Sequence, residues 1–194
     1  MQLLKKITLL SLLFVSAFSY AQETGPSKEV TVQSINKYMN EAVGMEYYIA
    51  YSVDENGNRI KDENGNYLYD KDYFAIIDYT LFSLEKVSRK TANKEKEGTY
   101  TEFNDFSNIK WENITSVDTT GDKSSETLTK VRINFSSKIK WHWTCYAGTY
   151  NVSCDQTEYY DGFGIYIPKN RVAACYKALM HLKELCTVED PFED

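Results

Sequence analysis

Four cysteines carry the most reactive side chains of this 194-residue chain, and their spacing limits how they can pair. Cys145 and Cys154 flank an eight-residue stretch that contains a glycine, so a hairpin can bring them together. Cys175 and Cys186 fall on one predicted helix, where eleven residues correspond to roughly 16 Å of rise, well beyond the reach of a disulfide. We therefore expect a Cys145–Cys154 disulfide. The helical pair lies on an apolar stripe, which favours buried thiols over a cysteine nucleophile.

Metal and cofactor chemistry has little support in the residue pattern. The chain has only two histidines, His142 and His181, and they lie on different predicted elements. No zinc-protease, phosphate-loop, nucleophile-elbow or paired-cysteine motif is present. We expect no metal, no cofactor and no catalytic residue.

One group of carboxylates leaves a hydrolase as an alternative. Asp155, Glu158 and Asp161 lie close together in the sequence, beside two tyrosines. Two carboxyl groups about 5 to 10 Å apart can act as acid and base on a glycosidic bond. Most clusters of this kind are solvated loops, so the hydrolase is the second alternative.

Sixteen tyrosines and three tryptophans make carbohydrate binding the first alternative, because sugar rings stack on exposed aromatic side chains. Trp141 and Trp143 alternate with polar residues on the same side as Ile139, which favours the inner face of a sheet. The tyrosines that we expect to be more exposed gather around the predicted disulfide hairpin: Tyr146, Tyr150, Tyr159 and Tyr160.

A short duplication, Asp54-Glu55-Asn56-Gly57-Asn58 and then Asp62-Glu63-Asn64-Gly65-Asn66, places two Asn-Gly pairs eight residues apart. An Asn-Gly pair is typical of a two-residue type I′ turn, so we expect two tight turns joined by a short strand. Calcium is the competing interpretation. Neither copy has the glycine and the glutamate that a calcium loop requires at its sixth and twelfth positions.

Hydrophobic periodicity predicts a helix at each end of the chain and strands between them. A 3.6-residue period covers residues 27–43, with Ser27 as N-cap, and residues 171–186, with Asn170 as N-cap. Residues 85–98 mix basic residues with glutamates and predict a solvated connection. Contact with an anion is the alternative, because this is the only locally basic stretch, but the interleaved glutamates cancel most of its field. The predicted strands are 45–53, 73–87, 99–106, 127–135, 139–146 and 163–167.

Six or seven antiparallel strands with a helix before and after them define an α+β fold with a curled sheet. The helix of residues 171–186, followed by Asp190-Pro191-Phe192, resembles the closing helix of the pleckstrin-homology-like superfold in small exported bacterial proteins of unassigned function. The resemblance implies a fold, not an activity. Phosphoinositide-binding members carry basic residues in the first hairpin, where this chain has acidic pairs, so we expect no lipid headgroup.

The N-terminus predicts export. Two lysines, an apolar run of about twelve residues and Ser19-Tyr20-Ala21 form a secretory signal peptide over residues 1–21, which leaves residues 22–194 as one domain. The apolar run is shorter than the roughly 20 residues of a membrane span, and none is expected after cleavage. A net charge of −6 argues against nucleic acid as a partner. We expect a non-catalytic binding module, periplasmic or secreted, for a protein or an envelope glycan.

Overall fold

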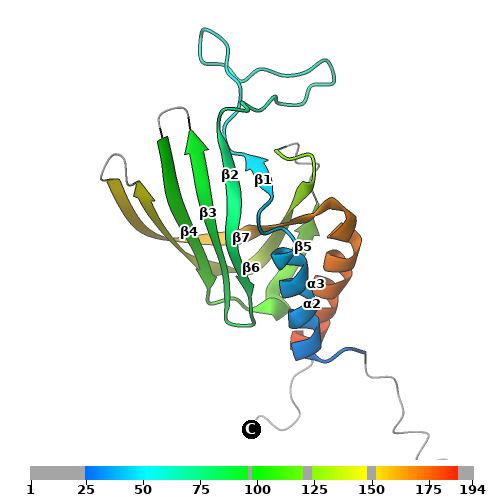
Figure 1. The fold of residues 1–194 in the computed structure, drawn as a ribbon. Coiled ribbons are helices and arrows are strands. Elements are labelled where there is room, and N and C mark those ends of the chain that lie inside the picture. The colour runs from blue at the N-terminus through cyan, green and yellow to red at the C-terminus, as the bar shows by residue number, and fades with distance from the viewer. Residues whose placement is uncertain (1–24, 96–97, 120–123, 148–151, 188–194) are drawn as a thin grey trace, which may run out of the picture.

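The computed structural model describes residues 25–95, 98–119, 124–147 and 152–187, and the predicted signal peptide and Tyr150 lie outside these ranges. A seven-stranded antiparallel sheet curls around two helices, which confirms the predicted α+β class (Figure 1). The strands follow the order β1-β2-β3-β4-β6-β5, and β7 pairs with β6. The elements are α2 (Lys28–Asn40), β1 (Glu46–Tyr48), β2 (Phe74–Phe82), β3 (Lys86–Glu95), β4 (Gly98–Ser107), β5 (Ile114–Asp118), β6 (Leu128–Ala147), β7 (Val152–Pro168) and α3 (Val172–Thr187).

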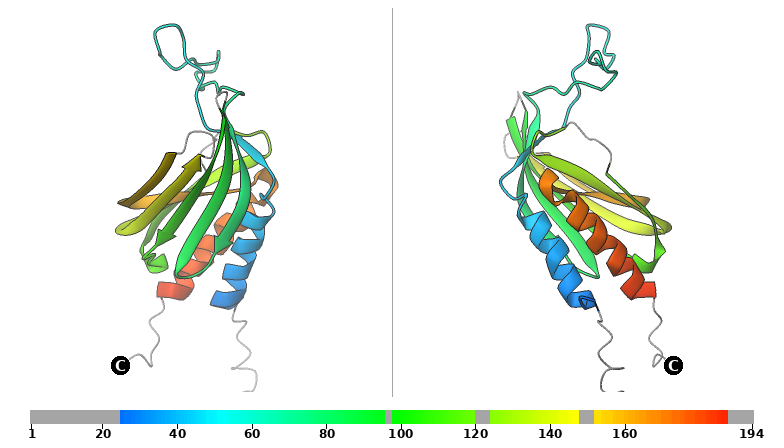
Figure 2. Two further views of the ribbon diagram at one scale, coloured as in Figure 1. Left: turned by 60° about the vertical axis from the view of Figure 1, so that its left-hand side comes forward. Right: turned by 90° about the vertical axis from the view of Figure 1, so that its right-hand side faces the viewer.

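The two helices lie side by side and pack into the open side of the curled sheet (Figure 2). Ser27 caps α2 as predicted, since its side chain accepts a hydrogen bond from the backbone of Val30. Asn170 does not cap α3; it lies in a 3-10 turn, Lys169–Arg171, and the α-helix begins at Val172. Leu179 of α3 is fully buried in one cluster with residues of the sheet and of α2, so the helices and the sheet share a core.

The long strand β6 replaces two predicted strands. Its twenty residues bend where the pairing with β7 shifts, between Asn134 and Ile139. Before the bend β6 pairs with β5 and the end of β7, and after the bend it pairs with β4 and the start of β7. The bend therefore turns one half of the sheet toward the other.

The prediction of a solvated connection over residues 85–98 was wrong, because most of this segment is β3, paired on both sides with β2 and β4. Side chains alternate across a strand. Lys86 and Lys90 form ion pairs with Asp105 and Asp78, whereas Val87 belongs to the buried core. The lysines that suggested a loop lie on the outer face of a strand. Strand β5 and the first eleven residues of β7 were also not predicted.

The duplicated motif forms two turns in an arm that projects from the sheet (Figure 1). The Asp54 side chain accepts hydrogen bonds from the backbone of Asn56 and Asn58 at 2.9 and 2.8 Å. Only the glycines have positive φ, 81° at Gly57 and 80° at Gly65, so the turns are not of type I′, which needs two such residues. The tight turns are confirmed and their type is corrected.

Candidate functional site

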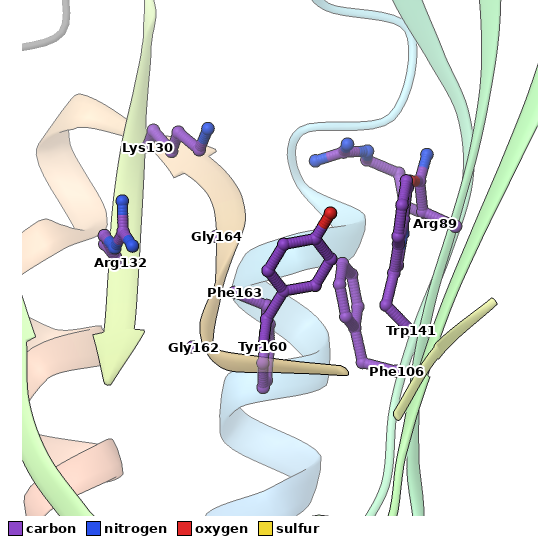
Figure 3. Close-up of a pocket in the computed structure, with 10 residues that line it drawn as sticks. Arg89, Phe106, Lys130, Arg132, Trp141, Tyr160, Gly162, Phe163 and Gly164 are labelled. Atoms are coloured by element: carbon purple, nitrogen blue, oxygen red, sulfur yellow. The ribbon is translucent and has the colours of Figure 1, made fainter. Parts of the chain in front are cut away.

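A cavity of about 250 Å³ lies between the two halves of the bent sheet. Four strands supply the residues that line it: Arg89 from β3, Asn104 and Phe106 from β4, Lys130, Arg132 and Trp141 from β6, and Tyr160, Gly162, Phe163 and Gly164 from β7. Figure 3 shows Lys130 and Arg132 on one strand, facing Arg89 and Trp141 across the ring of Tyr160. The bend in β6 creates this site, because Trp141 lies after it and the two basic residues lie before it.

Arg89 extends from the inner face of β3 and packs among aromatic rings. Its guanidinium carbon lies 4.9 Å from the ring centroid of Tyr166 and 5.9 Å from that of Tyr47, and these two rings stack at 4.1 Å. The Nε atom is buried and has no hydrogen-bond partner among the described residues. A buried donor without a partner costs about 1 to 3 kcal/mol, so the packing around Arg89 holds this side chain in place at an energetic cost.

Burial disfavours the charged form of Arg89, but Tyr47, Tyr166 and Glu102 outweigh it and raise the pKa of the guanidinium. The Glu102 carboxylate accepts hydrogen bonds from the amides of Asn93 and Asn104, at 2.8 and 2.6 Å. Arg89 therefore stays charged, while the Glu102 oxygens are occupied by neutral donors.

Lys130 and Arg132 occupy alternate positions of β6, opposite Tyr166 and Gly164 of β7. The missing side chain at Gly164 leaves room for Lys130, whose outer methylenes would collide with a Cβ atom there. Lys130 Nζ lies 5.9 Å from the Tyr166 ring centroid. Arg132 is exposed at the rim and donates to the Asn134 side chain at 3.0 Å.

The aromatic wall is anchored by polar contacts. Trp141 donates its indole N–H to Asn104 Oδ1 at 2.8 Å and packs edge-on against Tyr160, with ring centroids 5.5 Å apart. Trp143 stacks on Trp141 at 6.0 Å, and its buried indole N–H has no partner within the described ranges. Both tryptophans are half-buried on the inner face, as predicted from their alternation. A hydrogen bond to Glu158 raises the pKa of Tyr160.

The four tyrosines predicted from the sequence do not form one surface. Tyr160 is 41% exposed and lines the cavity. Tyr146 and Tyr159 are 62% and 60% exposed and alternate to the opposite, outer face of their strands. Tyr150 lies outside the described residues.

The structure contains the predicted Cys145–Cys154 disulfide, and Cys175 and Cys186 are free thiols. Burial raises the pKa of Cys175 to about 12, which makes it a poor nucleophile. No group of three potential metal ligands occurs within the described ranges.

The two histidines have separate partners, Asp155 for His142 and the Pro26 carbonyl for His181. The three candidate carboxylates are also separate. Asp155 pairs with His142, Glu158 accepts from Tyr160, and Asp161 pairs with Lys138 at 2.6 Å. Glu158 faces the opposite side of β7 from the other two, because odd and even positions alternate.

Of the four tyrosines predicted from the sequence, Tyr160 lines the cavity; Trp141, which was assigned to the inner face of the sheet and not to a site, lines it too. None of the three basic residues was predicted as a site residue. Arg89 lay in the segment read as a loop, and Lys130 and Arg132 lay in a predicted strand without being singled out. A sequence pattern was available: the alternation of Lys130 and Arg132 with buried Val131 and Ile133 places two cations on one face of a strand.

Comparison with protein-family models, curated proteins and solved structures finds no match for this chain. The pleckstrin-homology-like resemblance stays a prediction. Of the helices in the described ranges, none has the length and apolar character needed to cross a membrane.

Proposed function

We propose that the chain is an exported, non-catalytic binding module that holds a small molecule in the cavity between the two halves of its sheet. The observation that carries this proposal is the lining of the cavity, which combines aromatic rings with three basic side chains; one of these, Arg89, has a buried Nε donor without a partner among the described residues. Ligand pockets combine apolar walls with a few convergent polar groups in this way.

The chemistry of the lining residues favours binding over catalysis. Arg89, Lys130 and Arg132 contribute two guanidinium groups and one ammonium group to the lining of the cavity. Such groups orient and neutralise an anion, whereas general acid–base catalysis works best with a pKa near the operating pH. Export rests on the predicted signal peptide and fits the disulfide, since disulfides persist in oxidising compartments.

Nuclear magnetic resonance of the three tryptophan indole N–H groups tests the binding site directly. Anilinonaphthalene sulfonate and its neutral parent, phenylnaphthylamine, serve as probes. We expect at least one probe to shift the Trp141 signal, while Trp111, buried and bonded to the Leu84 carbonyl at 2.8 Å, stays unchanged.

Tyr160→Ala and Tyr159→Ala form a matched pair, because the two tyrosines are neighbours on opposite faces of β7. Loss of the cavity ring should weaken probe binding about tenfold, and loss of the outer ring should leave it unchanged. If neither probe shifts Trp141, or if both variants weaken binding equally, the cavity is not the binding site.

A second candidate function is carbohydrate binding on the outer face. It is favoured by the exposure of Tyr146 and Tyr159 on the same side of two paired strands. Retention of the protein on insoluble polysaccharide, lost in the double variant Tyr146→Ala/Tyr159→Ala and kept in Tyr160→Ala, would support it. Retention unaffected by the double variant would refute it.

A further inference from the structure

The charge around the cavity differs from the charge of the chain. The whole sequence carries −6, yet the described residues that line the cavity include three basic side chains and no acidic one. Like charges gathered in a partly enclosed site repel one another and focus a positive potential. An anion that enters the cavity is attracted by all three groups.

Arg89 supplies the most specific contact. Its planar guanidinium can form two parallel hydrogen bonds to a carboxylate, phosphate or sulfonate. The guanidinium carbon lies 4.9 Å from the Tyr166 ring centroid, and the buried Nε donor has no partner within the part of the chain that the structure describes. The Glu102 carboxylate, the acid that acts electrostatically on Arg89, is already bonded to two amide groups.

The remaining walls favour a ring. Trp141 and Tyr160 stand at 65° to each other, so one presents a face where the other presents an edge. Phe106 and Phe163 stack at 4.7 Å and add apolar surface. Aromatic groups pack well in such a corner, in offset-stacked or edge-to-face geometry.

This inference rests on the proposed function. We propose that the ligand is an aromatic molecule with one acidic group. Its carboxylate, phosphate or sulfonate binds Arg89, and its ring packs against Trp141 and Tyr160. Lys130 and Arg132 lie on the opposite side of the cavity and strengthen the attraction for the anion (Figure 3).

The two dyes of the preceding test separate this proposal from the proposed function, because they share a ring system and differ only in the sulfonate. We expect the sulfonate dye to bind the wild-type protein about ten- to a hundredfold more tightly than the neutral dye, as measured by fluorescence titration. If both dyes bind with equal affinity and still shift the Trp141 signal, the proposal that the ligand carries an acidic group is refuted, while the proposed function as a binding module is kept.

Arg89→Gln should remove most of this preference, with about a ten- to hundredfold loss for the sulfonate dye and little change for the neutral one. Lys90→Gln is the matched control: it removes the same charge from the next residue of β3, whose side chain pairs with Asp78. We expect no effect of the control on either dye. If both variants lost affinity for the sulfonate dye to a similar degree, the net charge of the protein would explain the effect, and Arg89 would be refuted as the anion-binding residue.

Because Arg89 is packed among rings, its replacement could unfold the protein, and two further variants keep the test decisive. Arg132 is exposed, so the Arg132→Gln protein should fold. We expect this variant to bind the sulfonate dye about two- to fivefold more weakly than the wild type. Arg89→Lys retains the charge without the planar fork and should restore part of the affinity. An unchanged preference in folded Arg132→Gln and Arg89→Lys proteins would contradict the assignment.

Discussion

Two glycines of β7 offer a test of how the cavity is built. Gly162 and Gly164 both line the cavity, but their hypothetical Cβ atoms meet different obstacles. At Gly162 the obstacle is backbone: the Ile133 carbonyl oxygen lies too close, and Asn134 Cα lies at 3.1 Å. At Gly164 the obstacle is the flexible side chain of Lys130, with Cγ at 3.0 Å and Cδ at 3.2 Å.

The free energies of unfolding of the two alanine variants should therefore differ. Gly→Ala stabilises by about 0.5 to 1 kcal/mol through the entropy of the unfolded chain. Gly164→Ala would lose the Lys130 contact with the Tyr166 ring, about 0.5 to 1 kcal/mol, so the net change is close to zero. Gly162→Ala requires a backbone shift that costs about 1 to 3 kcal/mol; with central values of about 2 kcal/mol for this cost and about 0.75 kcal/mol for the entropic gain, the variant should be about 1.2 kcal/mol less stable than the wild type.

Urea unfolding followed by tryptophan fluorescence measures both values, and equal slopes would show that the same surface unfolds in each. A loss in Gly164→Ala as large as that in Gly162→Ala would refute the reasoning, because it would mean that Lys130 cannot move. If Gly162→Ala left the free energy of unfolding unchanged, the backbones of β6 and β7 would not approach each other as closely at this position as the structure shows.

Two further predictions concern the cysteines. Reduction of the Cys145–Cys154 disulfide should lower the free energy of unfolding by about 2 to 3 kcal/mol, because the cross-link between residues nine positions apart restricts the unfolded chain. Urea unfolding with and without reductant measures this change. A Cys145→Ser/Cys154→Ser variant should not respond to reductant. The raised pKa of Cys175 means that the unfolded thiol ionises first, so stability should fall between about pH 9 and about 12, by up to about 1.4 kcal/mol per pH unit. Cys175→Ala should show a flatter decline over that range, and an equally steep one would exclude this thiol as the cause.

The helices could be predicted from the sequence because a single property determines each of them. A stripe of apolar residues recurs at helical spacing in α2 and α3, and Ser27 supplies the side-chain acceptor that begins α2. The two turns of the arm were predictable for a similar local reason, since Asp54 and Asp62 each accept hydrogen bonds from residues two and four positions later. Periodicity and capping act within a few residues, so no knowledge of the fold was needed.

Strand β3 could not be predicted in this way, because its stability comes from its neighbours. Thr91 and Asn93 are buried, but their side chains are polar, and lysines alternate with them on the other face. By local criteria such a segment is a loop. Pairing with β2 on one side and β4 on the other satisfies its backbone, and only the folded sheet shows that Arg89 points inward.

The candidate site depends on the bend of β6 more than on any single residue. The alternation that directs Val131 and Ile133 into the core directs Lys130 and Arg132 to the cavity. A one-residue shift of register would exchange these faces, and two cations would then replace two apolar residues in the core. The core therefore fixes the backbone positions of Lys130 and Arg132, since a register shift that withdraws them from the cavity also removes Val131 and Ile133 from the core. A stable fold and a positively charged cavity are in this protein two consequences of one strand register.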